Sequence, residues 1–159
     1  LKTPRASEIV LMVQTEVGER ILSPPGSSTY GALTVGVQSV ARATRVLKVP
    51  ASAFRPVPAI DSVVIRIRPS RPAPLGEREE QELRILTRIA FQQRRKQFQS
   101  ILRNHPDTAL GHDDIEALEE KTGFDLRNRP EEFSPEEFIR LAEALRENKG
   151  APRPGHSHP

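Results

Sequence analysis

A single aromatic residue, Phe54, stands at the head of a proline-rich segment that runs to Ser62 (FRPVPAIDS). Each proline fixes its own φ angle and pushes the preceding residue toward extended geometry. The segment therefore loses little conformational entropy when it orders, and it is suited to hold an aromatic ring still. Such a ring either stacks on a flat partner or plugs the edge of a sheet. Because Phe is commonly buried, the residue type alone favours the plug.

Positive charge is concentrated in the first two-thirds of the chain. Residues 1 to 105 contain 17 Lys/Arg against 8 Asp/Glu, whereas residues 106 to 159 contain 7 against 13, so the net charge of +3 hides a strong asymmetry. A basic region of this kind favours a polyanionic partner. The other interpretation, that the basic residues only solubilise the surface, stays open on charge count alone.

Part of this charge lies in a row of polar side chains with helical spacing. The row consists of Arg84, Arg88, Gln92, Arg95, Gln99 and Arg103. Steps of three and four residues place side chains on one face of a helix. Cations on such a face neutralise phosphates, which gives affinity without reading sequence. The alternative is an ordinary solvated helix face.

Familiar catalytic motifs are missing from the sequence, which has no glycine-rich nucleotide loop, no Gly-x-Ser-x-Gly elbow and no His-Glu-x-x-His. The absence of Cys excludes thiol chemistry and indicates a reducing compartment. The four histidines supply no set of three or four metal ligands, so we expect no metal. Without a long apolar run or the apolar core of a signal peptide, the chain is expected to be soluble and cytoplasmic.

The segments around the proline-rich segment alternate between strand and helix patterns. Residues 9 to 13 form a continuous apolar run, which predicts a strand buried on both faces as in a parallel sheet. Helical spacing follows over residues 14 to 22 and again over 29 to about 40. Strands are predicted over residues 44 to 49 and 62 to 68. This order resembles the closing part of an α/β sheet.

Only helices are predicted in the rest of the chain. A helical pattern extends over residues 77 to 103, but its apolar stripe lapses near Gln93 and Arg94, where we expect a bend or a junction. Another helix is predicted over residues 113 to 121. The last begins at Ser134, because Ser-Pro-Glu-Glu supplies an N-cap, a proline at the first helical position and the Glu of a capping box.

Several short motifs occur in one order along the chain. They are MVQTEV at 12–17 with Arg20, PGS at 25–27, YGALTV at 30–35, FRPVPAIDS at 54–62, AFQQRRK at 90–96 and SPEEF at 134–138. The succession closely resembles the C-terminal part of the ribosomal RNA adenine dimethyltransferases, which methylate the N6 of two adjacent adenines in small-subunit (16S) rRNA. The resemblance covers roughly residues 9 to 147, and the shared order makes chance similarity improbable although each motif alone is weak.

The resemblance implies an α/β plus α fold. Residues 1–69 would form the C-terminal strands of a Rossmann-like class I methyltransferase sheet, and residues 70–76 a linker. Residues 77–147 would form a small all-helical domain that docks on RNA or the ribosome. Residues 148–159, rich in Pro, Gly and His, would be a disordered tail.

By the same resemblance, Phe54 matches the aromatic residue that stacks on the flipped target adenine. Base–aromatic stacking contributes about 1–3 kcal/mol, and the family match reverses the preference for a core plug. Asp61 and Ser62 are expected to fix the turn from the loop into the strand through side-chain to backbone hydrogen bonds. Ala59 stands where the family usually has Lys, which puts one phosphate contact in doubt. Tyr30 is expected in the core.

The basic run Arg94, Arg95 and Lys96 matches a basic cluster that looks like the family's ribosome-docking element. Arg84, Arg88 and Arg103 line up with Arg95, so we expect all six cations to contact RNA. The implied partner is small-subunit rRNA or the immature 30S ribosomal subunit, without a membrane or a metal.

The resemblance also implies what the sequence lacks. Family members hold S-adenosylmethionine with a glycine-rich loop and an acidic residue, followed by an Asn-x-Pro-Tyr-like motif at the target amine. The only asparagines here, Asn104, Asn128 and Asn148, stand in other contexts. We therefore expect the cofactor to be bound by a missing N-terminal part, and this segment alone to be inactive.

Two other functions stay open. One is a non-catalytic RNA- or ribosome-binding assembly module. The other is a macrolide-resistance type 23S rRNA adenine methyltransferase, which shares the Phe-x-Pro loop. The SPEEF motif near the end of the chain favours the small-subunit enzyme.

Overall fold

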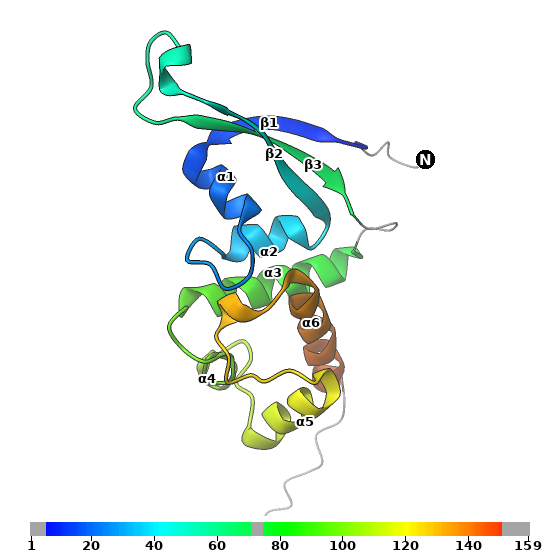
Figure 1. Ribbon diagram of the computed structural model, residues 1–159. Coiled ribbons are helices and arrows are strands. Elements are labelled where there is room, and N and C mark those ends of the chain that lie inside the picture. Colours follow the sequence, from blue (N-terminus) through cyan, green and yellow to red (C-terminus); the bar gives the residue numbers. More distant parts are fainter. Residues whose placement is uncertain (1–5, 71–74, 151–159) are drawn as a thin grey trace, which may run out of the picture.

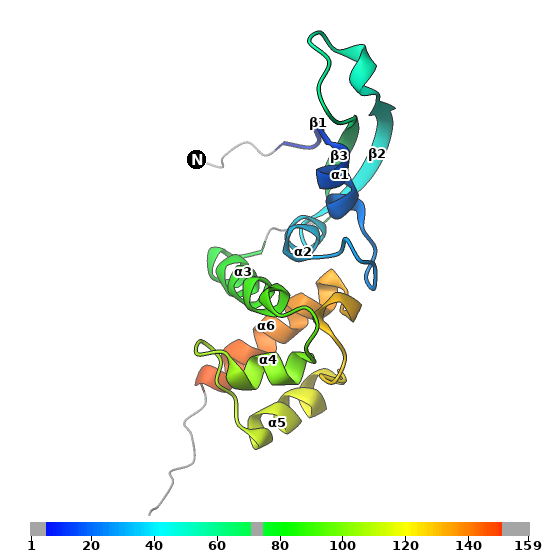
Figure 2. The ribbon, with the colours of Figure 1, turned by 90° about the vertical axis from the view of Figure 1, so that its left-hand side faces the viewer.

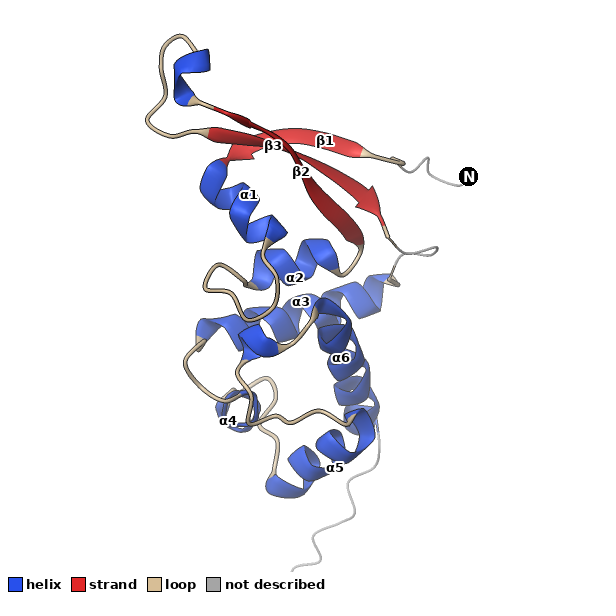
Figure 3. Ribbon diagram, in the orientation of Figure 1, coloured by secondary structure: helices blue, strands red, loops and turns tan. Residues whose placement is uncertain are grey.

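A small sheet lies at one end of the molecule and a group of helices at the other, with two short helices between them (Figures 1 and 3). The computed structural model describes residues 6–70 and 75–150. Within these ranges no helix has both the length and the hydropathy needed to cross a membrane.

The sheet has three strands, β1 (Ile9–Gln14), β2 (Ala41–Val49) and β3 (Ser62–Pro69), in the order β1-β3-β2. Both neighbours run antiparallel to the central strand β3. A bulge between Arg45 and Leu47 shifts the register of β2, and bulges of this kind increase the local twist. The two strands predicted beside the proline-rich segment are thus confirmed, and β2 begins earlier than predicted.

The prediction that the first strand is buried on both faces, as in a parallel sheet, is wrong for the described residues. β1 pairs antiparallel with β3 at one edge of the sheet. Ile9, Val10 and Met12 are 49%, 55% and 51% exposed, whereas Leu11 and Val13 pack on the core. A short apolar run does not distinguish a strand covered on both sides from an edge strand covered on one.

Helices α1 (Thr15–Leu22) and α2 (Ala32–Gln38) lie between the sheet and the other helices. Ile21 of α1 packs with Val63 and Ile65 of β3 in a small buried cluster. Gly18 lies so close to β3 that a Cβ atom there would overlap Cγ1 of Val63. The absence of a side chain at this position therefore sets how closely α1 approaches the sheet.

The remaining helices are α3 (Glu77–Gln92), α4 (Phe98–Asn104), α5 (His112–Thr122) and α6 (Pro135–Gly150). The separation of α3 from α4 confirms the predicted junction. The Ser134 cap is also confirmed: the Glu137 backbone N–H donates to Ser134 Oγ at 3.2 Å, and the Ser134 N–H donates to a Glu137 carboxylate oxygen at 2.7 Å.

The structure changes one predicted boundary and shows that a residue of the predicted linker is buried. α6 continues to Gly150, so the predicted tail does not begin at residue 148, and residues 151–159 lie outside the described residues. In the predicted linker, residues 71–74 also lie outside the described residues, and Leu75 is buried in the helical core.

The core of the helical part is rich in aromatic rings and includes one residue from the segment before α2. Tyr30 is fully buried there, as predicted, and its hydroxyl donates a hydrogen bond of 2.8 Å to the Phe133 carbonyl. Its ring also contacts Phe91 edge to face, with centroids 6.0 Å apart. Tyr30 thus fixes the α1–α2 connection to the helices although the two are distant in sequence.

The burial of Tyr30 predicts a loss of stability in alkali. Burial, and secondarily the charges of Glu136 and Glu137, raise the pKa of the Tyr30 hydroxyl well above its usual range. In the unfolded chain the hydroxyl ionises near pH 10. Above that pH the unfolded state releases a proton that the folded state retains, so the free energy of unfolding falls as the pH rises.

Tyr30→Phe is therefore expected to remove this part of the alkaline decline. At neutral pH it should cost about 1–3 kcal/mol, because the buried Phe133 carbonyl loses its donor. Urea unfolding between pH 7 and pH 11.5 measures both effects, and the phenolate absorbance of the single tyrosine reports ionisation directly. Ionisation of folded Tyr30 near pH 10 would contradict the prediction.

Candidate nucleic-acid interface

The loop that carries Phe54 is closed at its base by Asp61. The Ala51 backbone N–H donates to Asp61 Oδ1 at 2.8 Å. The backbone N–H and the hydroxyl of Thr15 both donate to the Asp61 carbonyl at 3.0 Å. These bonds confirm the predicted turn-fixing role of Asp61 and connect the loop to the start of α1. Ser62 instead lies in the β-ladder, opposite Val49 and Gln14.

Phe54 follows a 3₁₀ turn, Ala51–Ala53, at the tip of the β2–β3 hairpin, which projects beyond α1 (Figures 1 and 2). Its backbone N–H donates to the Ala51 carbonyl at 3.1 Å, and its side chain is half-buried. Val57 and Ile60 in the same loop are 55% and 51% exposed. The tip therefore presents an aromatic ring and two exposed aliphatic side chains in one short loop.

Phe54 differs from the other phenylalanines of the chain. Phe91, Phe98, Phe124, Phe133 and Phe138 all belong to the helical core and contact one another's rings. Phe54 belongs to neither buried cluster of the described residues. The loop geometry thus gives no support to the core-plug interpretation, and stacking on a base stays a prediction.

The prediction that the polar row from Arg84 to Arg103 lies on one continuous helical face is wrong. α3 ends at Gln92 and α4 begins at Phe98, so Arg95 lies in the turn between them. The turn is closed by a hydrogen bond of 2.9 Å from the Lys96 N–H to the Gln93 carbonyl. Phe98, the first residue of α4, is fully buried, and helical spacing alone does not reveal the change of direction before it.

Three of the predicted cations have nearby partners within the protein. Arg84 pairs with Glu80 one helical turn earlier, at 2.9 Å. Arg88 lies 4.0 Å from an Asp107 carboxylate oxygen. Arg103 lies 3.2 Å from the His112 ring. All three guanidinium groups are exposed, and part of their interaction capacity is already used.

The basic run in the α3–α4 turn divides into two kinds of residue. Arg94 is half-buried and donates to the Ser28 carbonyl at 2.9 Å, which fastens the turn to the α1–α2 loop. Arg95 and Lys96 are exposed, and the described part of the chain places no carboxylate in an ion pair with either. These two residues are the better candidates for phosphate contact.

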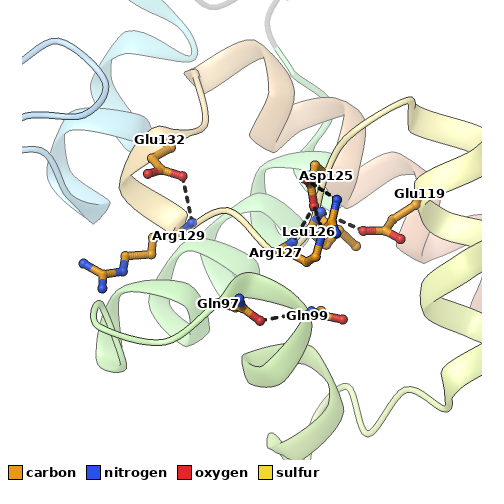
Figure 4. A network of polar contacts seen from close by, with 8 residues as sticks. All are labelled: Gln97, Gln99, Glu119, Asp125, Leu126, Arg127, Arg129 and Glu132. Carbon is orange, nitrogen blue, oxygen red and sulfur yellow. Dashed lines mark hydrogen bonds and ion pairs between the residues drawn. The ribbon is translucent and has the colours of Figure 1, made fainter.

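A further cation, Arg129, was missed by the sequence reasoning. The Phe98 and Gln99 N–H groups donate to the carbonyls of Asn128 and Leu126 at 2.9 and 2.8 Å. These bonds place the segment between α5 and α6 that contains Arg129 beside the start of α4. The Arg129 backbone N–H donates to Glu132 at 3.0 Å, and its guanidinium points away from the network (Figure 4). The segment has no helical or strand periodicity, so only its charge could have indicated the residue.

Arg127, in the same segment, is less available. It binds both carboxylate oxygens of Asp125, at 2.9 and 3.0 Å (Figure 4). Hydrogen bonds from Arg127 hold the pKa of the Asp125 carboxyl below its usual value. Arg127 thus provides a paired, exposed cation with which unpaired ones can be compared.

The passage from β1 into α1 differs from the turn that typically holds a nucleotide-type cofactor. Nucleotide-type cofactors are typically held where a strand passes through a glycine-rich turn into a helix. Here β1 passes from Gln14 directly into α1 at Thr15, and neither residue is glycine. No group of three or more potential metal ligands occurs in residues 6–70 and 75–150. The aromatic tip and the exposed cations are groups of the kind that contact bases and phosphates.

Comparison with known proteins gives a family match. The model of the family described as "Ribosomal RNA adenine dimethylase" matches residues 1–147. The chain is 42% identical over 144 residues to Ribosomal RNA small subunit methyltransferase A of Nitratidesulfovibrio vulgaris strain Hildenborough, covering 91% of this chain and 52% of the relative. It is 37% identical over 137 residues to the protein of that name from Nostoc punctiforme, covering 86% and 46%. The chain thus spans about half the length of these relatives.

Two solved structures resemble the fold. A dimethyladenosine transferase from Plasmodium falciparum superposes with a TM-score of 0.76 at 24% identity, covering 91% of this chain and 59% of that one. The 23S rRNA methyltransferase ErmE superposes with a TM-score of 0.60 at 25% identity, covering 91% and 57%. The sheet and the helices of this chain thus occur together in solved methyltransferases.

Proposed function

Because the chain belongs to the ribosomal RNA adenine dimethylase family, we propose that it is the RNA-engaging part of an enzyme that dimethylates adenine N6 in small-subunit rRNA. The methyl donor would be S-adenosylmethionine, held by the part of the relatives that the match does not cover. The observation that carries the proposal is 42% identity, over 91% of the chain, to a relative named for the small ribosomal subunit.

In this proposal the antiparallel sheet β1-β3-β2 corresponds to the closing strands of a Rossmann-like methyltransferase sheet. The open edge of β1 supports it, since an unpaired strand edge is a template for a further strand. The remaining strands would be supplied by the cofactor-binding part. The likeness to two methyltransferase structures over 91% of the chain is consistent with this placement.

The chemistry of the target explains why a rigid aromatic tip is useful. The N6 lone pair of adenine is delocalised into the ring, so transfer depends on positioning the amine against the methyl group. A base inside a folded RNA must first leave its stack, which costs a few kcal/mol. Phe54 would replace the lost stacking partner, and the hydrogen bonds that Asp61 accepts from Ala51 and Thr15 would hold the loop during transfer.

Arg95 and Lys96, with Arg129 nearby, would contact phosphates of the rRNA and dock the helical part on the small subunit. Arg84, Arg88 and Arg103 remain candidates for weaker contacts, since a phosphate would compete with their present partners. Arg94 would act by holding the turn in place.

The likeness to ErmE favours a second candidate, a methyltransferase of large-subunit rRNA. Binding to purified small and large ribosomal subunits distinguishes the two candidate functions. Small subunits assembled on unmethylated 16S transcript should bind this chain at least tenfold more tightly than large subunits do. Arg95→Glu/Lys96→Glu should weaken that binding at least tenfold, because docking through phosphates is electrostatic.

The matched control is Arg78→Glu/Arg127→Glu, which makes the same change of charge at two exposed cations that are paired with Glu82 and Asp125. Its binding to small subunits should stay close to that of the unchanged chain. Equal or tighter binding to large subunits would contradict the small-subunit assignment. Methyl transfer from labelled S-adenosylmethionine by this chain alone would contradict the proposal that the cofactor is held elsewhere.

A further inference from the structure

The β2 strand and the loop after it carry cations without neighbouring acids. Between residues 41 and 60 the sequence has Arg42, Arg45, Lys48 and Arg55 and no Asp or Glu. All four side chains are exposed. Within residues 6–70 and 75–150, none of the four forms an ion pair with a carboxylate. This distinguishes them from the arginines of α3, which lie beside Glu80, Glu82 or Asp107.

Two of these cations emerge on one face of the sheet. Arg45 lies opposite Ile65 and Lys48 opposite Val63 in the β2–β3 ladder. Ile65 and Val63 are buried on the face covered by α1 and α2, so Arg45 and Lys48 lie on that face, in the exposed part of the edge strand β2. Two ladder steps separate the pair, about 7 Å along the strand. Arg42 is opposite Arg68 and faces the other side.

The path of the hairpin leads from these cations to the aromatic tip. β2 ends at Val49, the short turn Ala51–Ala53 follows, and Arg55 is the neighbour of Phe54. The Arg55 guanidinium lies 3.4 Å from the Phe54 carbonyl. Positive charge therefore continues along one strand up to the residue that is expected to stack on a base.

The hairpin tip and the α3–α4 turn, which carries Arg95 and Lys96, lie on the same side of the molecule. In Figures 1 and 2 the hairpin tip, the α1–α2 loop and the α3–α4 turn follow one another along one side. The bond from Arg94 to the Ser28 carbonyl joins the last two. An RNA that touches both Phe54 and the α3–α4 turn would thus approach the molecule from the side on which the hairpin projects.

We propose that Arg45, Lys48 and Arg55 form a phosphate-binding strip that holds the RNA backbone next to the nucleotide stacked on Phe54. The strip is a second RNA contact, separate from the cations of the α3–α4 turn, and it rests on the proposed rRNA substrate. Its role is to fix the RNA backbone that carries the target base, while Arg95 and Lys96 of the α3–α4 turn dock the rest of the RNA. Phosphate contacts of this kind set register and orientation without reading sequence.

The competing explanation is that charges on an edge strand only prevent pairing with other chains. The two explanations predict different results for RNA binding. A phosphate contact contributes to the salt dependence of affinity, with a slope of about 0.7 to 0.9 per contact in a plot of log K against log salt. Protection of a strand edge contributes nothing to that slope.

The test measures binding of the 159-residue chain to unmethylated 16S transcript at several salt concentrations. Arg45→Gln/Lys48→Gln should bind roughly tenfold more weakly at low salt, with the slope reduced by about 1.5 for two lost contacts. Arg45→Lys/Lys48→Arg keeps both charges and should keep affinity and slope. Arg78→Gln/Arg127→Gln removes two exposed, paired charges outside the sheet and should leave the slope close to that of the unchanged chain.

Circular dichroism and light scattering on each variant establish that it is folded and monomeric. An unchanged slope in folded, monomeric Arg45→Gln/Lys48→Gln, beside normal binding by the parent chain, would overturn the strip and leave the proposed function intact. An equal loss in the Arg78→Gln/Arg127→Gln control would also overturn it, because the effect would then reflect net charge alone. Absence of RNA binding by the unchanged chain would overturn the proposed function, and the strip with it.

Discussion

Phe54→Ala is expected to lower kcat/KM for adenine methylation about 10- to 100-fold, in an enzyme made by joining this chain to the uncovered part of the Nitratidesulfovibrio vulgaris relative. Loss of one base–aromatic stack costs about 1–3 kcal/mol, and each 1.4 kcal/mol corresponds to a factor of ten. Because Phe54 lies outside both buried clusters, the substitution should change the free energy of unfolding by no more than about 1 kcal/mol.

Phe54→Trp supplies the control, since a different ring that can still stack should retain most of the activity. Phe54→Leu keeps an apolar side chain of similar size without a π-face and should behave like alanine. Methyl incorporation into small subunits lacking the modification measures all three variants. Wild-type activity in folded Phe54→Leu would show that the ring contributes bulk rather than stacking.

Alanine substitution at Phe138 is expected to lower the free energy of unfolding strongly, whereas at Phe54 it should leave that quantity nearly unchanged. Phe138 is fully buried, and its ring contacts those of Phe91 and Phe98 with centroids 5.6 Å away in both cases. Phe138→Ala removes these contacts and leaves a cavity, which typically costs about 3–5 kcal/mol. Small domains have only about 5–15 kcal/mol of unfolding free energy in total, so the variant should lose a large share of it.

Urea unfolding followed by far-UV circular dichroism measures this effect, with Phe54→Ala as the matched control. Phe138→Leu preserves most of the apolar volume and should lose less stability than Phe138→Ala. A change below about 1 kcal/mol for Phe138→Ala would contradict the view that this ring anchors the helical core.

The elements with local signals were predicted well. The Ser134 cap depends on residues within one helical turn, and the hydrogen bonds between Ser134 and Glu137 are those that the motif predicts. The lapse of the apolar stripe near Gln93 likewise located the junction between α3 and α4. Asp61 was expected to fix the turn after the proline-rich segment, and it does so by accepting from Ala51.

Features that depend on long-range pairing were not predictable in the same way. The apolar run of β1 is equally compatible with a central parallel strand and an antiparallel edge strand. Its antiparallel pairing with β3, more than forty residues later in the sequence, is visible only in the tertiary structure. The availability of cations is also a tertiary property. Arg94 and Arg95 are neighbours in sequence, yet Arg94 binds the Ser28 carbonyl and Arg95 stays exposed.

By itself, the sequence determined the family, the position of Phe54 beside the prolines, the Ser134 cap and the concentration of positive charge. Each of these depends only on residue types and short spacings. Only the tertiary structure decided the order β1-β3-β2, the partner of the buried Tyr30 hydroxyl and the exposure of Arg45 and Lys48 beside the loop of Phe54. Strand pairing and side-chain burial depend on which segments distant in sequence pack together, and short spacings carry no information about that packing.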